Sequence, residues 1–435
     1  MPPAAGSASF RSASKTCSDG RSQHVTEPQL YASIISLAAV ASYLNCRFLR
    51  VPAAIGLMAI ALGLSALLVA LAHLAGLDME PLVKRISSID FSLLLLHGML
   101  PFLLFAGALG VDLNEMRGHL VAITTLPTLG VAIATLVTGA VLWLASRAVG
   151  PNLGFLECLL FGALISPTDP IAVVAILRQA GTSKALESVI GGESLFNDGV
   201  GVVVFLAILG ALYGGTVPGP VTLVLRLAVE VVGGIGFGLV IGWVGYRLLR
   251  TVDMYPVEIF LTLAIAAGGY AAAEALHVSA PLAIVAAGLV IGSIGRRAGM
   301  SARTVQHLDS FWEVIDQVLN AVLFLLVGLE VVIVIETHAI GLALAAIIAV
   351  LVGRFASVAP LVAVMRRVKR ISAGSLTILT WGGLRGGISL ALAMSLPAGK
   401  SRDVILTATY VVVVFSVLVQ GLTLKRLARA AAASA

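Results

Sequence analysis

The chain has 435 residues, of which 59% are hydrophobic and only 11% are charged. A soluble globular domain carries roughly 25% charged residues, so this composition excludes an ordinary soluble enzyme and a disordered chain. The net charge of +6 does not indicate a nucleic-acid binder, because the basic residues lie between long apolar runs rather than in one patch. The three cysteines are too few for a disulfide framework, and none lies in a CxxC motif. The sequence predicts an all-α polytopic membrane protein.

The residues before the first apolar run are rich in serine and contain three basic residues. We expect a disordered N-terminal tail over 1–28, and the alternative of a transit peptide is weaker. The chain contains no Walker A pattern. We therefore expect no nucleotide partner and no ATP-driven transport.

Thirteen apolar segments approach the length of about 20 residues that a helix needs to cross a membrane. The ninth is short, and the boundary between the first two depends on a break at Arg47, Arg50 and Pro52. We expect about 13 transmembrane helices, over 30–48, 51–71, 91–111, 120–145, 153–177, 185–212, 221–248, 257–276, 280–294, 311–335, 339–365, 376–396 and 404–424.

The basic residues orient the predicted bundle, because cytoplasmic loops carry an excess of Lys and Arg. With the C-terminus inside, most of these residues fall on the cytoplasmic side, for example Arg366, Arg367, Lys369 and Arg370 between two spans. An odd number of spans then places the N-terminus outside. We expect a multi-pass protein of the cell membrane, in particular a bacterial inner membrane.

The fifth apolar segment contains a helix break in the middle of the predicted span. Its Ser-Pro-Thr-Asp-Pro run at 166–170 holds two prolines, each of which lacks an amide hydrogen and disfavours helical geometry in the residue before it. Backbone carbonyls freed at such a break, that of Thr168 among them, need a partner inside the membrane. A bound cation can be that partner, with the carboxylate of Asp169 beside it.

The twelfth segment contains a second break. Its Trp-Gly-Gly-Leu-Arg-Gly-Gly run at 381–387 surrounds Arg385 with four glycines, which loosen a helix and let a neighbouring backbone approach. Each broken segment is the fifth of six in its half of the chain. Broken helices at corresponding places of two halves are typical of inverted-repeat secondary transporters, whose substrate site lies near the middle of the membrane. An inert bundle with two kinked helices would leave Asp169 and Arg385 unexplained.

The sixth segment carries Glu-Ser-Leu-Phe-Asn-Asp at 193–198. Residues four apart share a helix face, so Ser194 lies beside Asp198, and Glu193 beside Asn197. A hydroxyl beside a carboxylate suits a small alkali cation, and a desolvated carboxylate also takes up a proton readily. One carboxylate that binds either a cation or a proton is the minimal exchanger. The alternative is a structural polar ladder in which Asp198 caps another helix.

Two arginines within spans, Arg354 and Arg385, need buried anionic partners because arginine does not lose its proton. Glu193 is the natural candidate, and Arg354 is the better match. The residues alone leave the choice between the two arginines open.

Four motifs in order along the chain resemble a known family. They are the runs at 166–170, 193–198 and 381–387 and a run from Phe311-Trp312-Glu313 through Asn320 to Glu330. Together they resemble the sodium/proton antiporters of the NhaP/NHE-like branch of the monovalent cation/proton antiporters. The resemblance extends from about residue 30 to 425.

This resemblance implies two inverted six-helix repeats with two broken crossing helices, a homodimer, and an elevator-like movement of a transport domain against a dimerisation domain. Transferred to this chain, it implies four groups of helices. They are dimerisation-domain helices 1–3 over 29–111, transport-domain helices 4–6 over 118–213, linker and dimerisation-domain helices 7–10 over 220–335, and transport-domain helices 11–13 over 337–428.

The resemblance also implies which residues form the site. Asp198 binds the ion or the proton, while Asp169, the Thr168 carbonyl and Ser194 help to coordinate Na⁺. Asn197 supports the crossing of the broken helices. The family couples an Asn-Asp pair to electroneutral exchange, and the physical argument agrees, because Asn197 leaves a single titrating acid and hence one proton per ion. Glu193, Arg354 and Arg385 support the site.

One position departs from the family. Many relatives carry Glu where this chain has Ala106, and that glutamate can contribute to the ion site. Its absence leaves the preference among Na⁺, Li⁺ and K⁺ open. Asp112 and Glu115 lie near the inner end of that span, too far along to replace it.

We expect a secondary transporter that exchanges Na⁺ (or Li⁺) for H⁺ across the lipid bilayer, without a cofactor, and serves pH and sodium homeostasis. The nearest alternative is a K⁺/H⁺ antiporter of the same fold. An intramembrane protease is a remoter alternative, because Ser194 has no histidine base in register. A channel, which would conduct without proton coupling, is the other.

Overall fold

The computed structural model describes residues 27–76, 91–111, 126–180, 184–214, 220–334, 339–367 and 374–433. Within these ranges the chain is helical and has no strand. Its α-helices are, in chain order, α1 (Glu27–Leu44), α2 (Ala53–Ala75), α4 (Phe91–Leu93), α5 (Leu100–Leu109), α8 (Val131–Val149), α9 (Phe155–Leu164), α10 (Pro170–Ala180), α11 (Lys184–Tyr213), α12 (Pro220–Leu249), α13 (Tyr255–Ala275), α14 (Ala280–Val290), α15 (Arg296–Ala298), α16 (Ala302–Val334), α17 (Ile340–Arg367), α18 (Ser375–Trp381), α19 (Gly387–Met394), α20 (Lys400–Val414) and α21 (Gly421–Ala433).

Ten helices in the described part are long and apolar enough to cross a membrane. The fifth predicted span is divided into α9 and α10, and the twelfth into α18 and α19. The ninth is the shorter apolar helix Ala280–Gly295. The all-helical membrane fold is therefore confirmed, whereas the number of thirteen crossings stays a prediction. The expected N-terminal tail lies, up to residue 26, outside the described residues.

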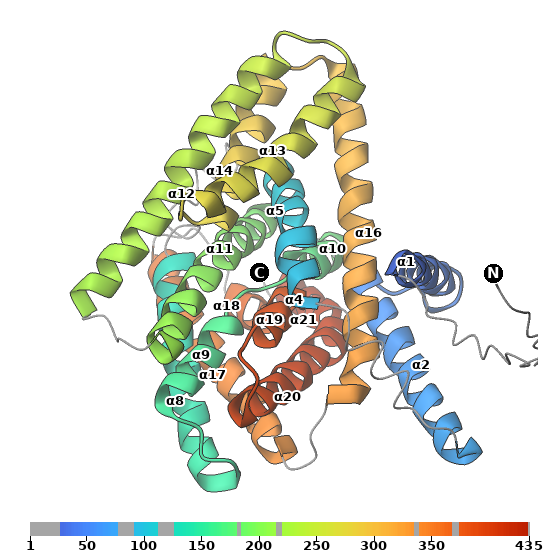
Figure 1. Cartoon of the computed structure of the whole chain (residues 1–435), viewed down its shortest axis with the longest axis vertical. Helices are drawn as coiled ribbons and strands as arrows, with labels where there is room; N and C mark the ends of the chain where they lie inside the picture. The colour runs from blue at the N-terminus through green and yellow to red at the C-terminus, as the bar shows by residue number, and fades with distance from the viewer. Residues whose placement is uncertain are drawn as a thin grey trace, which may run out of the picture.

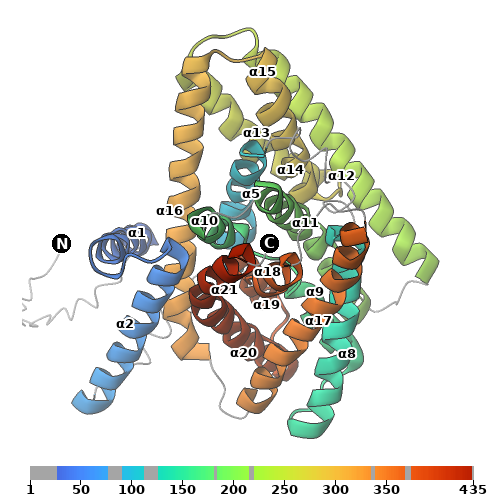
Figure 2. The same cartoon turned by 180° about the vertical axis from the view of Figure 1, so that it is seen from behind.

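Two groups of helices form the body of the molecule (Figure 1). In one group α12, α13 and α14 pack together, and in the other α8 packs against both α9 and α17. The long helix α16 runs along one side and contacts α2, α5 and α13. Figure 2 shows the same arrangement from behind, with α10 and α11 lying between the two groups.

Small residues bring the helices of the second group close together. An added Cβ on Gly162 of α9 would overlap the backbone carbonyl oxygen of Thr135 on α8. An added Cβ on Gly353 of α17 would overlap the hydroxyl of Thr138, also on α8. Helices in a membrane associate through such close backbone contact, because lipid supplies no hydrophobic force between them. The glycines therefore set the spacing of α8, α9 and α17.

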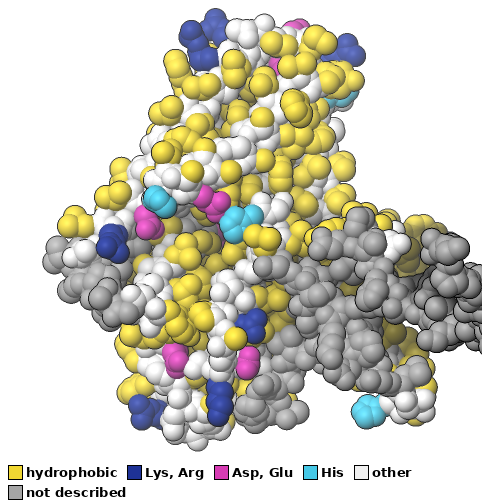
Figure 3. Space-filling view, viewed as in Figure 1, with side chains coloured by type: hydrophobic (Ala, Val, Ile, Leu, Met, Phe, Trp, Pro, Cys, Tyr) yellow, Lys and Arg dark blue, Asp and Glu magenta, His cyan; other side chains and the backbone are white. Residues whose placement is uncertain are grey.

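Apolar side chains cover much of the face drawn in Figure 3, above all its upper half. Large hydrophobic residues are exposed on several of the long helices, including Leu74 on α2, Val232 on α12 and Phe260 on α13. Large exposed apolar patches mark contact with lipid or with another protein. The chain is a multi-pass membrane protein, and these surfaces face the bilayer or a partner.

Candidate ion-binding site

The two broken helices meet at their breaks. Between α9 and α10, and between α18 and α19, the backbone is not helical. The backbone N–H of Asp169 in the first break donates a hydrogen bond to the carbonyl of Leu384 in the second, at 2.7 Å. A Cβ on Gly386 would lie only 3.1 Å from the Cβ of Asp169. Glycine at this position lets the two extended stretches cross in direct contact.

Side chains satisfy carbonyls that the prolines free in the first break. The Nδ2 of Asn197 donates to the carbonyl of Ser166 at 2.9 Å. The guanidinium of Arg385 donates to the same carbonyl and, at 3.2 Å, to that of Pro167. Breaks inside a membrane are tolerated where neighbouring groups take over the freed backbone. At Ser166 and Pro167 the protein itself therefore supplies the partner that the sequence led us to expect from a cation.

A π-helical stretch in the last span, Phe415–Gln420, holds the second break. The hydroxyl of Ser416 accepts a hydrogen bond from the backbone N–H of Arg385 at 2.9 Å. The Nε2 of Gln420 donates to the carbonyl of Trp381 at 3.1 Å. Residues four apart share a helix face, so this stretch directs both polar side chains at the break. Sequence reasoning did not identify either residue.

Glu193 of α11 pairs with Arg354 of α17. Both nitrogens at the end of the guanidinium donate to the carboxylate, one of them at 2.9 Å, and Nε donates to the carbonyl of Leu379 on α18 at 3.1 Å. Both side chains are buried. The structure thus decides the pairing that the sequence left open, in favour of Arg354. The pair ties α11, α17 and α18 together directly before the second break.

Asp198 lies on α11, one turn after Ser194, and is 7% exposed. Ser194 is turned to the first break, where its hydroxyl lies 2.8 Å from that of Thr168. Among the described residues, nothing donates a hydrogen bond to Oδ1 of Asp198 or to Oδ1 of Asn197, although both atoms are buried. A buried acceptor without a partner is costly unless a proton or a bound ion satisfies it.

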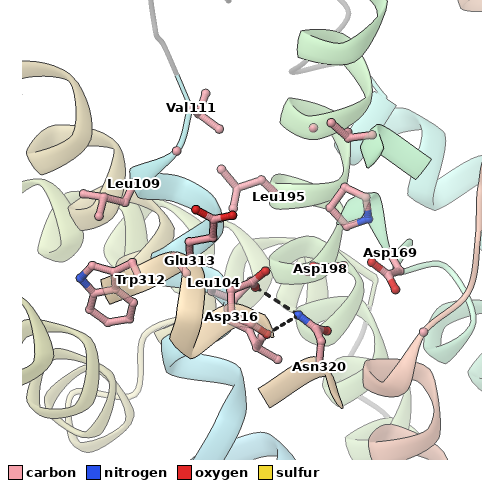
Figure 4. A pocket seen from close by; sticks show the side chains of 18 of the residues that line it. Leu104, Leu109, Val111, Asp169, Leu195, Asp198, Trp312, Glu313, Asp316 and Asn320 are labelled. Carbon is pink, nitrogen blue, oxygen red and sulfur yellow. Dashed lines mark hydrogen bonds between the residues drawn. The ribbon is translucent and has the colours of Figure 1, made fainter. Parts of the chain in front are cut away.

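A cavity of about 1130 Å³ reaches this site. Its walls are α5, the first break with α10, α11, α16 and the start of α19. Three of the predicted site residues, Thr168, Asp169 and Asp198, line it. Figure 4 labels Asp169 and Asp198. The other five are buried and are not among the residues that line the cavity: Glu193, Ser194, Asn197, Arg354 and Arg385. Ala106 also lines the cavity, without an oxygen to offer to an ion. Asp112 and Glu115 lie outside the described residues.

One wall of the cavity was not assigned to the site from the sequence, although Glu313 and Asn320 belong to one of the four motifs. Asp309, Glu313 and Asp316 of α16 all line it, together with Asn320. The spacing of four, three and four residues along the chain places them on one helix face. That spacing was visible in the sequence, but nothing in it showed that this face is turned to the site.

A helical membrane protein with two crossing broken helices and a buried carboxylate in a cavity beside them has the architecture of a secondary transporter. Comparison with known proteins identifies the group. Residues 34–430 match the family described as "Sodium/hydrogen exchanger, transmembrane", and the chain belongs to this family. It is therefore a secondary transporter and not an enzyme.

Named relatives and a solved structure agree with this assignment. The chain is 47% identical to the Na(+)/H(+) antiporter NhaP of Pseudomonas aeruginosa over 92% of this chain and 96% of the relative. It is 35% identical to the Na(+)/H(+) antiporter NhaH of Halobacillus aidingensis over 75% of this chain and 80% of the relative. Its fold resembles that of the sodium proton antiporter MjNhaP1 from Methanocaldococcus jannaschii, with a TM-score of 0.63 and 20% identity over 86% of this chain and 97% of that one.

Proposed function

We propose that this protein exchanges Na⁺ for H⁺ across the membrane, one for one, by binding each ion in turn at Asp198. The observation that carries the proposal is that Asp198 lines the cavity while its buried Oδ1 accepts no hydrogen bond from the described residues. A proton or a small cation can each satisfy this oxygen. The two cannot bind it together, so that release of one ion accompanies uptake of the other.

Oxygen ligands near Asp198 suit Na⁺, a hard cation that prefers oxygen. Asp169 and Thr168 line the same cavity from the first break. The hydroxyl of Ser194 lies against the hydroxyl of Thr168. In our proposal Asp198 and Asp169 supply charge, and the Thr168 carbonyl and the Ser194 hydroxyl complete the coordination. The crossing of the two breaks holds these groups in place.

The expected ratio of one proton to one ion depends on Asn197. Its Nδ2 group is engaged with the Ser166 carbonyl and lies 3.4 Å from the Thr168 hydroxyl. An amide holds the break without titrating. Asp198 is then the single acid of α11 that alternates between proton and Na⁺, which makes the exchange electroneutral.

The shape of the cavity supports alternating access. Arg178 and Arg296 line it, and both fall on the side that the distribution of Lys and Arg assigns to the cytoplasm. Leu100, Leu103 and Ile388 line both this cavity and a small pocket whose lining residues are all apolar. We infer an inward-open state. The elevator proposal moves the helices of 118–213 and 337–428 against those of 29–111 and 220–335, and carries the site past these apolar residues.

A homodimer in the cell membrane, with the N-terminus outside and the C-terminus in the cytoplasm, belongs to the same proposal. The exposed apolar side chains of the long helices support it, since they suit lipid or a second copy of the chain. Exchange of this kind would serve pH and sodium homeostasis.

The test is a flux assay on the purified protein in liposomes that contain a pH-sensitive dye. Na⁺ and Li⁺ are expected to drive proton movement, and K⁺ to drive less. Asp198→Asn should abolish the response, because an amide neither binds the cation as a charge nor exchanges a proton. Asp253→Asn, the same change at an exposed acid between α12 and α13, should leave it intact. A response to K⁺ equal to that to Na⁺, or normal exchange by Asp198→Asn, would contradict the proposal.

Competition at one carboxylate also predicts a pH dependence. As the pH falls, a larger fraction of Asp198 carries a proton, so the Na⁺ concentration that gives half the maximal rate should rise. In the limit of full protonation the increase is tenfold per pH unit, because each proton bound removes one Na⁺ site. The same assay over a series of pH values measures it. A half-saturating concentration that does not change with pH would show that the two ions bind at different sites.

A further inference from the structure

One face of α16 carries three carboxylates into the cavity. Asp309, Glu313 and Asp316 lie on the same face as Asn320. From the first to the last of these four residues, α16 rises about 16 Å at 1.5 Å per residue. The polar stripe therefore runs from the end of the cavity at Arg296 toward the level of the broken helices. Ionisable residues within a span are costly and usually mark the path of a substrate.

The three carboxylates are held differently. Asp309 pairs with Arg296, so its charge is compensated. Glu313 is exposed and accepts a hydrogen bond from Gln317 at 3.2 Å. Asp316 is half-buried, and Asn320 of the same helix donates to its Oδ1 at 3.1 Å (Figure 4). A carboxylate has about four acceptor sites, so this bond leaves most of the acceptor capacity of Asp316 turned to the cavity.

Asp316 does not hold α16 to another helix. Within the described part of the chain its hydrogen bonds go to Asn320 alone, which also donates to the Asp316 backbone carbonyl at 2.9 Å. A buried carboxylate with a structural role, such as Glu193, instead joins separate helices. The packing of α16 therefore gives no reason for an acid at this position.

The opposite wall of the cavity independently indicates a cation. There the 7%-exposed Asp198 has an oxygen without a hydrogen-bond donor among the described residues. Ala106 of α5 contributes no oxygen to the space between the two walls. Of the three carboxylates on α16, Asp316 lies farthest along the stripe from Arg296, and it lines the same cavity as Asp198.

We propose that Asp316 forms a second cation site, which binds Na⁺ inside the cavity before the ion reaches Asp198. The inference rests on the proposed exchange of Na⁺ for H⁺. A carboxylate in a cleft with low-dielectric walls raises the local concentration of cations. Asp316 therefore lowers the Na⁺ concentration that gives half the maximal rate. The maximal rate itself depends on Asp198 and the broken helices.

The test compares Asp316→Asn with the unchanged protein in the liposome assay. The half-saturating Na⁺ concentration should rise about tenfold, the lower end of the range for electrostatic focusing, with the maximal rate within about twofold. Asp316→Glu keeps the charge, so its half-saturating Na⁺ concentration should stay near that of the unchanged protein. Glu313→Gln removes the same charge from an exposed position on the same stripe, and should also change little. An unchanged half-saturating concentration in Asp316→Asn, or an equal rise in Glu313→Gln, would overturn the second site.

A second measurement does not depend on transport. In the Asp198→Asn variant, NaCl should still raise the unfolding temperature relative to choline chloride, and adding Asp316→Asn should remove this rise. An equal rise in both variants would overturn the inference. The two proposals fail in different ways. If the unchanged protein exchanges Na⁺ and Asp316→Asn has the same half-saturating Na⁺ concentration, only the second site is wrong. Absence of exchange by the unchanged protein would contradict the proposed function itself.

Discussion

Neighbouring polar residues of α11 contact different partners. Glu193 pairs with Arg354 on α17, Ser194 contacts Thr168, and Asn197 holds the Ser166 carbonyl. Successive helix positions point in directions about 100° apart, so a short polar run can reach several neighbours. Asp198 is the carboxylate of this run that keeps an oxygen without a partner among the described residues, and the amide oxygen of Asn197 is the other such atom. The surrounding bonds fix the helix, and we propose that the Asp198 carboxylate is the group that binds the ion.

The buried pair of Glu193 and Arg354 predicts a strong effect on stability. Arg354→Met should lower the unfolding temperature of the purified protein, because it leaves the Glu193 carboxylate buried without its partner. Removing one member of a buried pair costs roughly 3–5 kcal/mol. The measurement is thermal unfolding in detergent, with the yield of folded protein as a second indicator.

The double variant Glu193→Met/Arg354→Met is the control for this prediction. It removes both charges and should be more stable than Arg354→Met alone, since no isolated charge remains. Its unfolding temperature should still be below that of the unchanged protein, because Arg354 also donates a hydrogen bond to the carbonyl of Leu379. An unchanged unfolding temperature in Arg354→Met would show that the pair contributes nothing to stability.

At the scale of elements, the two breaks behave as one assembly. A backbone hydrogen bond joins them directly, and Arg385 from the second break reaches the carbonyls of the first. Asn197 attaches α11, and Ser416 attaches the last span. An element held by so many bonds is not free to deform around an ion. We therefore expect the breaks to move together with α11 rather than separately.

The approach of α9 to α8 positions the first break and can be tested at Gly162. The Ser166 hydroxyl donates to the Gly162 carbonyl at 2.7 Å, so this turn leads directly into the break. Gly162→Ala should destabilise the protein by about 1–3 kcal/mol, the usual effect of overpacking, because the added Cβ meets the backbone of Thr135. The unfolding temperature and the exchange rate should both fall.

Gly63→Ala on α2 is the matched control. Apart from the local backbone of α2, no atom of the described residues lies within 4 Å of a Cβ added at this position. Alanine favours a helix over glycine by up to about 1 kcal/mol, so this variant should be as stable as the unchanged protein or more so. Equal behaviour of the two variants would mean that the contact between α8 and α9 does not constrain the break.

At the scale of the whole molecule, the cavity lies among α5, α10, α11, α16 and the start of α19, and we infer that it opens toward the cytoplasm. Val111, the last described residue of the third predicted span, lines it together with Arg178 and Arg296. The apolar residues Leu100 and Leu103 line both this cavity and the small apolar pocket next to it. In the inward-open state that we propose, the apolar residues close the cavity on the side away from Arg178 and Arg296, as alternating access requires.

A cysteine at Val111, in a chain whose own cysteines are replaced by serine, tests the direction of this opening. In the inward-open state a membrane-impermeant maleimide should label it from the side that also exposes a C-terminal epitope tag. Vesicles of the two orientations provide the comparison. Labelling from the opposite side alone would contradict either the inward-open state or the predicted orientation.

Much of the fold followed from local rules. A membrane demands about 20 apolar residues for each crossing and a partner for each backbone group. The two interrupted spans therefore stood out by Pro167 and Pro170 in one and by the glycines around Arg385 in the other. Asp198, Asp169 and Thr168 were found because charge or proline inside an apolar run is conspicuous. Ser416 and Gln420 of the last span are uncharged and do not interrupt a helix, so nothing in the sequence indicated their role.

The sequence by itself determined the membrane class, the helical segments, the two breaks and the lone acid beside them, because each depends on residues close together in the chain. Only the tertiary structure decided that Glu193 meets Arg354, that Arg385 turns to the first break, and that the acidic face of α16 lies across the cavity from Asp198. Those contacts join residues more than 100 positions apart. They depend on how each helix is rotated and placed against its neighbours, which close packing of the whole bundle sets and no single segment encodes.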